Sequence, residues 1–187
     1  MKLNFLKSVF LMTFLASLLS ACATQKLADI PTVPQVDLPK FMGDWYVIAA
    51  IPTLIEKQSY NAIENYQLNP DGTIATTFTF NKGGLEGEFK TYQPRGFVVE
   101  NSGTALWGMQ FIWPIKAEYR IAYLNADYTQ TIIARNARDY VWIMARTSTI
   151  SDADYDALTA IIASYGYDLS LLRKVPHNAA LNHNYEN

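Results

Sequence analysis

Cysteine and histidine, the residues that most often build metal and nucleophilic centres, are almost absent from this sequence. Cys22 is the single cysteine, and both histidines, His177 and His183, lie in the polar segment 177–187, which we expect to be a disordered tail. A lone cysteine excludes an intramolecular disulfide. The sequence also lacks a Gly-x-Ser-x-Gly motif and a phosphate-binding loop. We therefore predict no catalytic residue, no metal site and no cofactor.

Charged residues are also scarce, at 17% of the chain, and the net charge is −2. No basic patch of the kind that binds nucleic acid is visible, so we predict no nucleic-acid partner. The sequence is rich instead in aromatic residues, with 12 Tyr, 9 Phe and 4 Trp. Aromatic residues favour β-strands, and the length without a leader corresponds to one domain of about 150 residues.

The N-terminal apolar run, residues 8–19, is shorter than the roughly 20 residues that a membrane-spanning helix needs. With its basic start and small residues at its end, segment 1–21 predicts a secretory leader. The end, Leu19-Ser20-Ala21-Cys22, resembles the lipobox of bacterial lipoproteins, in which the cysteine is acylated after cleavage. The resemblance implies a lipid anchor at Cys22, and Ala23 is similar to the pattern of proteins sent to the outer membrane. Residues 22–40, with three prolines, are expected to form an extended, lipidated tether.

Short strand-like runs separated by turn signals follow the tether. Residues 69–73, "NPDGT", are a strong hairpin signal, and the lack of helices between the runs favours antiparallel order in a sandwich or a closed barrel. One helix is predicted from the N-cap Ser151 to about Tyr165, with Gly166 in the left-handed position and one apolar face that packs outside the sheet. The predicted strands are Tyr46–Ile51, Ala62–Leu68, Ile74–Asn81, 88–100, Ala105–Ile112, Glu118–Leu124, Thr129–Arg135 and Tyr140–Arg146.

With these elements placed, the sequence resembles the lipocalin family, in its bacterial outer-membrane lipoprotein type. Gly43-Asp44-Trp45-Tyr46 matches the first family signature, Asn125-Ala126-Asp127-Tyr128 is similar to the second, and Arg146 matches the third. The resemblance implies an all-β fold, an eight-stranded antiparallel up-and-down β-barrel with one C-terminal α-helix packed outside, in a domain spanning residues 41–176. It also implies that Arg146 lies across the Trp45 indole at the closed end of the barrel. Structural roles are therefore assigned to Gly43, Trp45, Asp127 and Arg146.

The alternation of side chains along strands then predicts which residues face a cavity. Counting alternate residues forward from Trp45 and back from Arg146 predicts which side chains of the first and last strands face inward. In the strands with an alternating pattern, the apolar set is taken as the inward one. The family resemblance implies that residues of the strands before and after the second signature also face inward, among them Ile132 and Ala134. The predicted ligand-binding residues are Val47, Ala49, Phe78, Phe80, Trp107, Met109, Phe111, Tyr119, Ile121, Tyr123, Tyr140, Trp142 and Met144.

This lining is aromatic and aliphatic, with Tyr hydroxyls as its main polar groups, which favours an apolar ligand with one polar end. Any one of these aromatic residues could equally serve as plain core. The parity around Phe97 stays open because a bulge is expected near residues 94–96. An inward Glu64 would be costly unless it lay near the mouth, and we assign it no role.

The leading hypothesis is a non-enzymatic, outer-membrane-anchored protein that holds a fatty acid or lysophospholipid for storage, transport or envelope maintenance. Its partners would be this ligand and, through acylated Cys22, the membrane; a homodimer stays open. Two alternatives remain: a lipid-modifying enzyme on the same scaffold, and a structural envelope lipoprotein whose barrel is filled with side chains. The identity of the ligand and the face of the outer membrane are not determined by the sequence.

Overall fold

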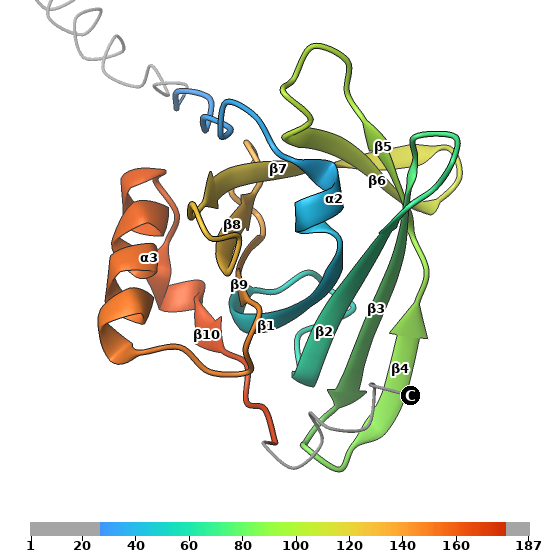
Figure 1. Ribbon diagram of the computed structural model, residues 1–187. Coiled ribbons are helices and arrows are strands. Elements are labelled where there is room, and N and C mark those ends of the chain that lie inside the picture. The colour runs from blue at the N-terminus through green and yellow to red at the C-terminus, as the bar shows by residue number, and fades with distance from the viewer. Residues whose placement is uncertain (1–26, 179–187) are drawn as a thin grey trace, which may run out of the picture.

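A computed structural model of the chain describes residues 27–178. The predicted leader, Cys22 and most of the predicted tail, including His183, lie outside these residues. Figure 1 shows the strands wrapped into a barrel with one longer helix, α3, beside it. The elements are α2 (Leu38–Phe41), β1 (Gly43–Ile51), β2 (Ser59–Leu68), β3 (Ile74–Lys82), β4 (Glu88–Tyr92), β5 (Arg95–Val98), β6 (Leu106–Ile112), β7 (Ile115–Leu124), β8 (Gln130–Ala134), β9 (Val141–Ala145), α3 (Asp152–Ser164), the 3-10 helix η2 (Leu169–Leu171) and β10 (Arg173–Lys174).

The strands pair as antiparallel neighbours in chain order, and β1 pairs with β9 to close the barrel. Strands β4 and β5 both pair with β3 and share one place in the wall, so the barrel has the eight-stranded, up-and-down order that the sequence predicts. The short strand β10 adds to the other side of β1, through Ala49 and Ala50.

The hairpin signal at residues 69–73 forms the turn between β2 and β3. The Asn69 N–H donates to the Thr73 carbonyl at 2.8 Å, and the Gly72 N–H donates to the Asn69 carbonyl at 3.0 Å. Gly72 has φ of +79°, a conformation that glycine adopts without steric cost. The turn residues therefore set the register of this hairpin, as predicted.

Helix α3 packs against the outside of the barrel, as predicted, through a second apolar cluster that is separate from the barrel interior. The Ser151 hydroxyl caps the helix by accepting from the Asp154 N–H at 3.1 Å. Gly166 follows the helix with φ of +83°, the left-handed position expected of it. Leu158 and Ile162 are the helix residues that are fully buried.

Residues 27–37, expected to belong to an extended tether, run along the outside of the barrel instead. The Val33 N–H donates to the Ile121 carbonyl and the Val36 N–H to the Gly103 carbonyl, both at 2.9 Å. Ile30 is buried against the cluster beneath α3. Prolines exclude helix here but leave apolar side chains free to pack, so the described part of the tether belongs to the domain.

The start of the predicted tail is also ordered, which corrects the expectation for residues 177 and 178. The His177 Nε2–H donates to the Val47 carbonyl at 2.8 Å, and the Asn178 N–H donates to the Asn61 side chain at 2.7 Å. Burial lowers the pKa of His177. Within residues 27–178, no helix has both the length and the apolar character to cross a membrane.

Candidate functional site

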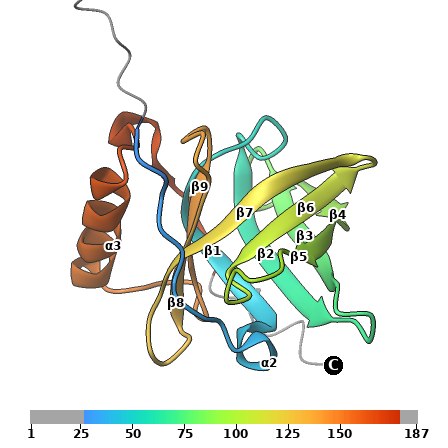
Figure 2. The same cartoon turned by 90° about the horizontal axis from the view of Figure 1, so that it is seen from above.

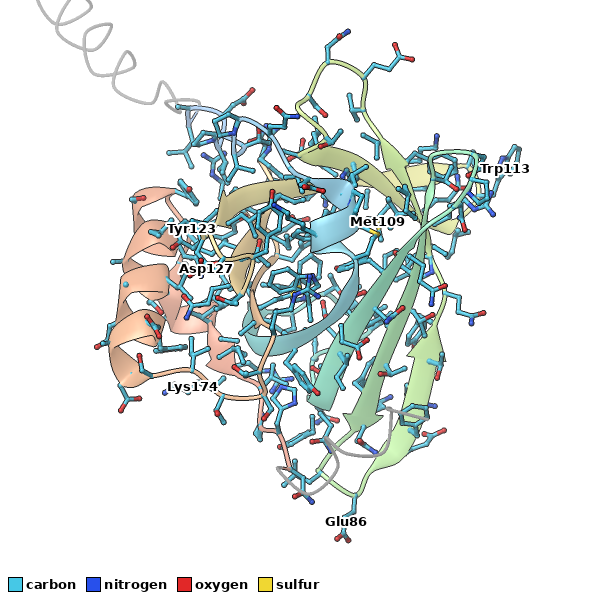
Figure 3. The ribbon with its side chains drawn as sticks, viewed as in Figure 1. Glu86, Met109, Trp113, Tyr123, Asp127 and Lys174 are labelled. Carbon is cyan, nitrogen blue, oxygen red and sulfur yellow. The ribbon has the colours of Figure 1, made fainter. Side chains whose placement is uncertain are left out.

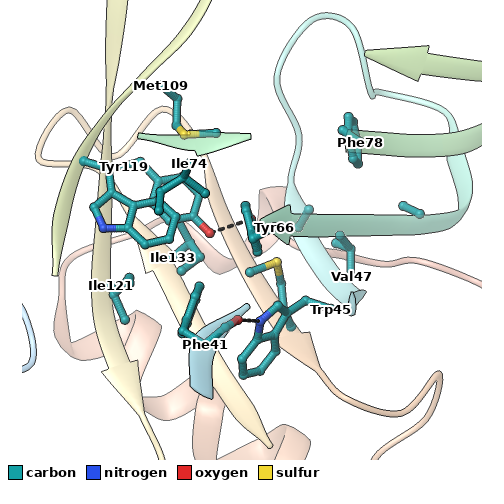
Figure 4. Packing of buried hydrophobic residues seen from close by; sticks show 14 of the residues in the cluster. Phe41, Trp45, Val47, Tyr66, Ile74, Phe78, Met109, Tyr119, Ile121 and Ile133 are labelled. Atoms are coloured by element: carbon teal, nitrogen blue, oxygen red, sulfur yellow. Dashed lines mark hydrogen bonds between the residues drawn. The ribbon is translucent and has the colours of Figure 1, made fainter. Parts of the chain in front are cut away.

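The barrel is plugged at one end by a short helix and a tryptophan. Phe41 of α2 lies 5.0 Å from the Trp45 ring, and the Trp45 indole N–H donates to the Phe41 carbonyl at 2.8 Å. The Arg146 guanidinium lies over the Trp45 ring, 3.9 Å from its centroid. Figure 4 shows Phe41 and Trp45 together at the base of the packed interior. The predicted contact between Arg146 and Trp45 is thus present.

Above this plug lies a layer of aromatic side chains. The Tyr66 and Tyr119 hydroxyls are 2.6 Å apart and hydrogen-bonded, as the dashed line in Figure 4 marks. Trp107 stacks on Tyr119 with ring centroids 5.0 Å apart, and its indole N–H donates to the Thr104 carbonyl at 2.7 Å. Burial is the main cause that raises the pKa of both Tyr66 and Tyr119 well above the usual range. The two tyrosines are therefore a neutral, hydrogen-bonded floor.

A cavity of about 640 Å³ lies on the other side of this floor and opens at the end of the barrel opposite α2. Figure 2 shows α2 at one end and the loop between β1 and β2 at the other. This volume is within the range of pockets that hold a small molecule. The lining residues are Pro52–Glu56, Glu64, Phe78, Tyr92–Pro94, Met109, Phe111, Ile112, Ala117, Tyr119, Arg135, Asp139, Tyr140 and Trp142.

The barrel wall is interrupted beside the cavity. Strand β5 pairs with β6 from Arg95 to Val98. Strand β4 pairs with β3 and with no other described strand, so its second edge is unpaired within the described residues. Pro94, which has no N–H to donate, stands at the break together with Gln93. Lining residues come from both sides of this break, Tyr92 on one and Phe111 on the other. The expected bulge near residues 94–96 is thus an interruption of the strand.

Two carboxyl groups, those of Glu56 and Glu64, lie inside this largely apolar cavity. Glu56 is fully engaged, because one carboxyl oxygen accepts from the Thr53 N–H at 2.8 Å and the other from the Trp142 indole N–H at 3.0 Å. The Glu64 Oε2 is buried without a hydrogen-bond partner among residues 27–178. Burial raises the pKa of both carboxyls, and the negative charge of Glu56 raises that of Glu64 further.

The mouth of the cavity carries a charged pair and an apolar rim. The Arg135 guanidinium pairs with the Asp139 carboxylate at 2.6 Å, and it also lies 5.2 Å from the Tyr140 ring. The Tyr140 hydroxyl donates to the Glu118 carbonyl, and burial raises the pKa of Tyr140. Around them project large exposed apolar side chains, of which Leu54 is 83% exposed, Trp113 82% and Ile112 72%. Figure 3 shows Trp113 at the outer tip of the β6–β7 turn.

The structure places the thirteen predicted lining residues in three groups. The first group lines the cavity, the second lies in the packed interior of the barrel, and the third faces the outer cluster beneath α3. The group to which a residue belongs depends on its depth along the barrel and on which face of its strand carries the side chain. The first group is Phe78, Met109, Phe111, Tyr119, Tyr140 and Trp142; the second is Val47, Phe80, Trp107, Ile121 and Met144; the third is Ala49 and Tyr123.

The inward positions predicted for Ala49 and Tyr123 are wrong because a bulge precedes each of them. The register shifts between Val47 and Ala49 in β1, and between Ile121 and Tyr123 in β7. An extra residue reverses the parity of everything beyond it. Figure 3 shows Tyr123 on the side of the barrel beside α3, across from Met109.

The inward face of β8 differs from the prediction because β8 pairs with β7 beyond the bulge in β7. Ile132, predicted to face inward, pairs with Tyr123 and packs in the outer cluster with Ala134. Ile133 takes the inward place and lies in the barrel interior (Figure 4). In β1, the bulge likewise leaves Ile51 in the outer cluster and turns Ala50 inward. These positions correct the predicted lining on the side of the barrel that α3 covers.

The structural role predicted for Asp127 also needs correction. Asp127 is exposed on the β7–β8 turn (Figure 3), and the side chain that organises the turn is Asn125. Its carboxamide oxygen accepts from the N–H groups of Thr129, at 2.8 Å, and Gln130, at 3.0 Å. Gly43 has φ of +90°, a conformation that residues with a side chain rarely adopt, which fits the structural role predicted for it. A Cβ added at this position would lie 3.5 Å from the Arg146 guanidinium.

Sequence reasoning missed the loop between β1 and β2 as part of the site, and with it Glu56. It considered an inward Glu64 but assigned it no role, although Glu64 lies two residues before the inward Tyr66 on the same strand. That spacing was the available signal. Within the described part of the chain, no group of three or more His, Cys, Asp or Glu side chains could hold a metal ion.

A β-barrel that is closed at one end by packed aromatic residues, and that holds a small-molecule-sized cavity at the other, defines a cup-shaped ligand-binding protein. A family model described as a lipocalin-like domain matches residues 36–177. The chain therefore belongs to the lipocalin-like family, as its three signatures predict.

Two relatives show how far the sequence likeness extends. The chain is 29% identical over 162 residues to temperature-induced lipocalin-1 of Arabidopsis thaliana, covering 80% of this chain and 84% of the relative. It is 27% identical over 151 residues to the outer membrane lipoprotein Blc of Escherichia coli (strain K12), covering 75% and 79%. Among solved structures, insecticyanin of Manduca sexta superimposes with a TM-score of 0.64 at 14% identity, covering 82% of this chain and 87% of that one. This last likeness concerns the fold alone.

Proposed function

We propose that the protein is a membrane-anchored, non-enzymatic carrier that holds one hydrophobic or amphiphilic molecule, a fatty acid or a lysophospholipid, in its barrel. The observation that carries the proposal is the cavity of about 640 Å³, open at one end and lined mainly by apolar and aromatic side chains. Storage, transport or envelope maintenance would follow from such binding. Likeness to outer membrane lipoproteins named Blc, together with the lipobox at Cys22, supports the outer membrane as its location.

The energetics of this cavity suit a single acyl chain. Burying several hundred Å² of chain contributes several kcal/mol at about 25 cal/mol per Å², before the cost of ordering the ligand. The net value corresponds to dissociation constants of about micromolar or somewhat tighter. The space for such a chain is already present in the ligand-free barrel, above the floor formed by Tyr66 and Tyr119.

Filling the cavity with a side chain tests the proposal. Ala117 lines the cavity on β7, and Ala117→Phe should weaken binding of a fluorescent fatty acid at least about tenfold. Ala126→Phe, on an exposed turn at the other end of the barrel, is the matched control and should leave binding unchanged. Displacement titrations with unlabelled fatty acid and lysophospholipid measure the effect.

The same titrations separate the alternatives. If the purified wild-type protein binds no displaceable lipid probe, the structural lipoprotein with a filled barrel is the better explanation. If it hydrolyses a bound lipid ester, and Ala117→Phe abolishes that turnover, the protein is a lipid-modifying enzyme. Equal binding by Ala117→Phe and wild type would show that the ligand lies elsewhere.

A further inference from the structure

Glu64 has a buried carboxyl group that lines the ligand cavity. It lies on β2, where its Cα pairs with those of Trp45 and Phe78, and its side chain lines the cavity directly above the layer of Tyr66. The residue is 9% exposed, and among the described residues its Oε2 has no partner. A buried polar atom left unpaired destabilises the fold, so a retained one calls for an explanation.

Two other polar side chains that line the cavity, Glu56 and Tyr119, already make hydrogen bonds. The Glu56 carboxyl accepts from the Thr53 N–H and the Trp142 indole. The Tyr119 hydroxyl bonds that of Tyr66. A ligand that reaches the floor therefore meets, in Glu64, a carboxyl oxygen that has no hydrogen-bond partner among the described residues.

The distribution of apolar surface gives the ligand a direction. The mouth is lined by apolar side chains such as Leu54, Phe111 and Ile112, while the carboxyl of Glu64 lies at the deep end. An alkyl chain is best accommodated against the apolar mouth, and a polar group against the carboxyl. The arrangement thus favours entry with the polar end first.

We propose that Glu64 is a head-group subsite that accepts a hydrogen bond from the hydroxyl, amide N–H or ammonium group of an amphiphile bound with its polar end inward. The proposal rests on the carrier function above and narrows its ligand class. Neutral and cationic head groups are favoured over anionic ones, because an anion at this depth would face both Glu64 and Glu56. A fatty acid would then bind in its neutral form.

The protonation of Glu64 adds a second signature. Burial, and then the charge of Glu56, raise the pKa of Glu64 in the empty cavity. An ammonium ligand stabilises the ionised carboxylate, so its binding releases a proton and its affinity rises with pH. An alcohol gives no such dependence. The titratable and charged groups that also face the cavity are Glu56, Tyr92, Tyr119, Arg135, Asp139 and Tyr140, with Tyr66 below.

A series of ligands with one chain and three head groups tests the subsite: dodecylamine, 1-dodecanol and dodecanoate. Each competes with the neutral fluorophore N-phenyl-1-naphthylamine for the full-length protein at pH 8. Wild type should bind dodecylamine at least about tenfold more tightly than dodecanoate. Glu64→Gln should reduce this preference to about threefold or less, with 1-dodecanol changed least. Glu88→Gln, an exposed site on β4, is the matched control and should retain the full preference.

Calorimetry of dodecylamine binding to wild type in two buffers of different ionisation enthalpy measures proton release and needs no variant. Proton release with dodecylamine and none with 1-dodecanol supports the subsite. If wild type binds dodecanoate as tightly as dodecylamine, or if folded Glu64→Gln keeps the preference, the subsite is refuted while the carrier function stands. If none of the three displaces the fluorophore, both the subsite and the carrier function are refuted.

Discussion

At the scale of single residues, Arg146 does more than stack on Trp45. Its guanidinium donates to the carbonyls of Asp44 at 2.7 Å, Lys40 at 2.9 Å and Phe41 at 3.0 Å. These carbonyls belong to the chain that leads from α2 into β1, while Arg146 directly follows β9. One side chain therefore ties both sides of the barrel seam to the plug.

We expect Arg146→Ala to lower the free energy of unfolding by about 2–4 kcal/mol, because several charge-assisted hydrogen bonds and a cation-π contact are lost together. Arg146→Lys keeps the charge but not the planar fork, and should lose an intermediate amount. Urea denaturation measures both. Ligand affinity should stay unchanged, since the cavity lies beyond the aromatic floor, and a large loss of affinity with little loss of stability would contradict this assignment.

Glu64 makes a prediction about pH at the same scale. Because burial raises its pKa in the folded protein, the stability linked to its protonated form is fully present below the unfolded value near 4.5 and is lost as the pH rises through the folded value. Glu64→Gln removes that loss. The variant should therefore be more stable than wild type at pH 8, by about 1–3 kcal/mol, and should show little gain at pH 4.

Denaturation of the ligand-free protein across this pH range measures the difference between the two proteins. Glu56, whose pKa is raised in the same sense, titrates in both proteins, so the difference reports Glu64 together with its coupling to Glu56. If Glu64→Gln gains as much stability over wild type at pH 4 as at pH 8, ionisation of the Glu64 carboxyl does not destabilise the protein.

At the scale of elements, two bulges decide which faces of β1, β7 and β8 look inward. Those strands form the side of the barrel that α3 covers, where both faces are apolar because one packs in the barrel and the other beneath the helix. An alternating pattern is then absent, so a shift of one residue leaves no mark in the sequence. On the opposite side, β3 alternates Thr and Phe, and its predicted parity is correct.

Helix α3 should stabilise the barrel without contributing to ligand binding. Ile162 is fully buried between the helix and the wall, and Ile162→Ala should cost about 2–4 kcal/mol of stability. Leu171→Ala, at an exposed site in η2, is the control and should cost less than about 0.5 kcal/mol. Chemical denaturation and probe titration of each variant measure the two effects. A loss of affinity in Ile162→Ala, under conditions where it is fully folded, would show that the helix shapes the cavity.

At the scale of the whole molecule, the N-terminal segment links the plug to the open end of the barrel. From α2 it runs back along the wall, where the Ile30 N–H donates to the Asn136 side-chain oxygen at 2.8 Å and the Arg138 guanidinium donates to the Ala28 carbonyl. Figure 2 shows this segment reaching the end opposite α2. From Ala28 to Cys22 the chain can span at most about 21 Å, so an anchor at Cys22 would hold Ala28 within about that distance of the membrane.

Cys22→Ser should move the protein from the membrane fraction to the soluble fraction, because the acyl chains that hold it are lost. Ala23→Ser retains the cysteine and should remain with membranes. Cell fractionation followed by immunoblotting measures both. If the Cys22→Ser protein stays in the membrane fraction after leader cleavage, acylation of this residue is not what anchors it.

The sequence by itself determined the order of strands, the β2–β3 turn, the capped helix and the pairing of Trp45 with Arg146. Each of these depends on local backbone chemistry or on motif residues, and both can be read along the chain. Tertiary structure decided the inward faces of Ala50 and Ile133, the packing of residues 27–37, and the burial of Glu64 beside Glu56. Those outcomes depend on cross-strand register and on which surfaces meet, and neither is encoded within any one segment.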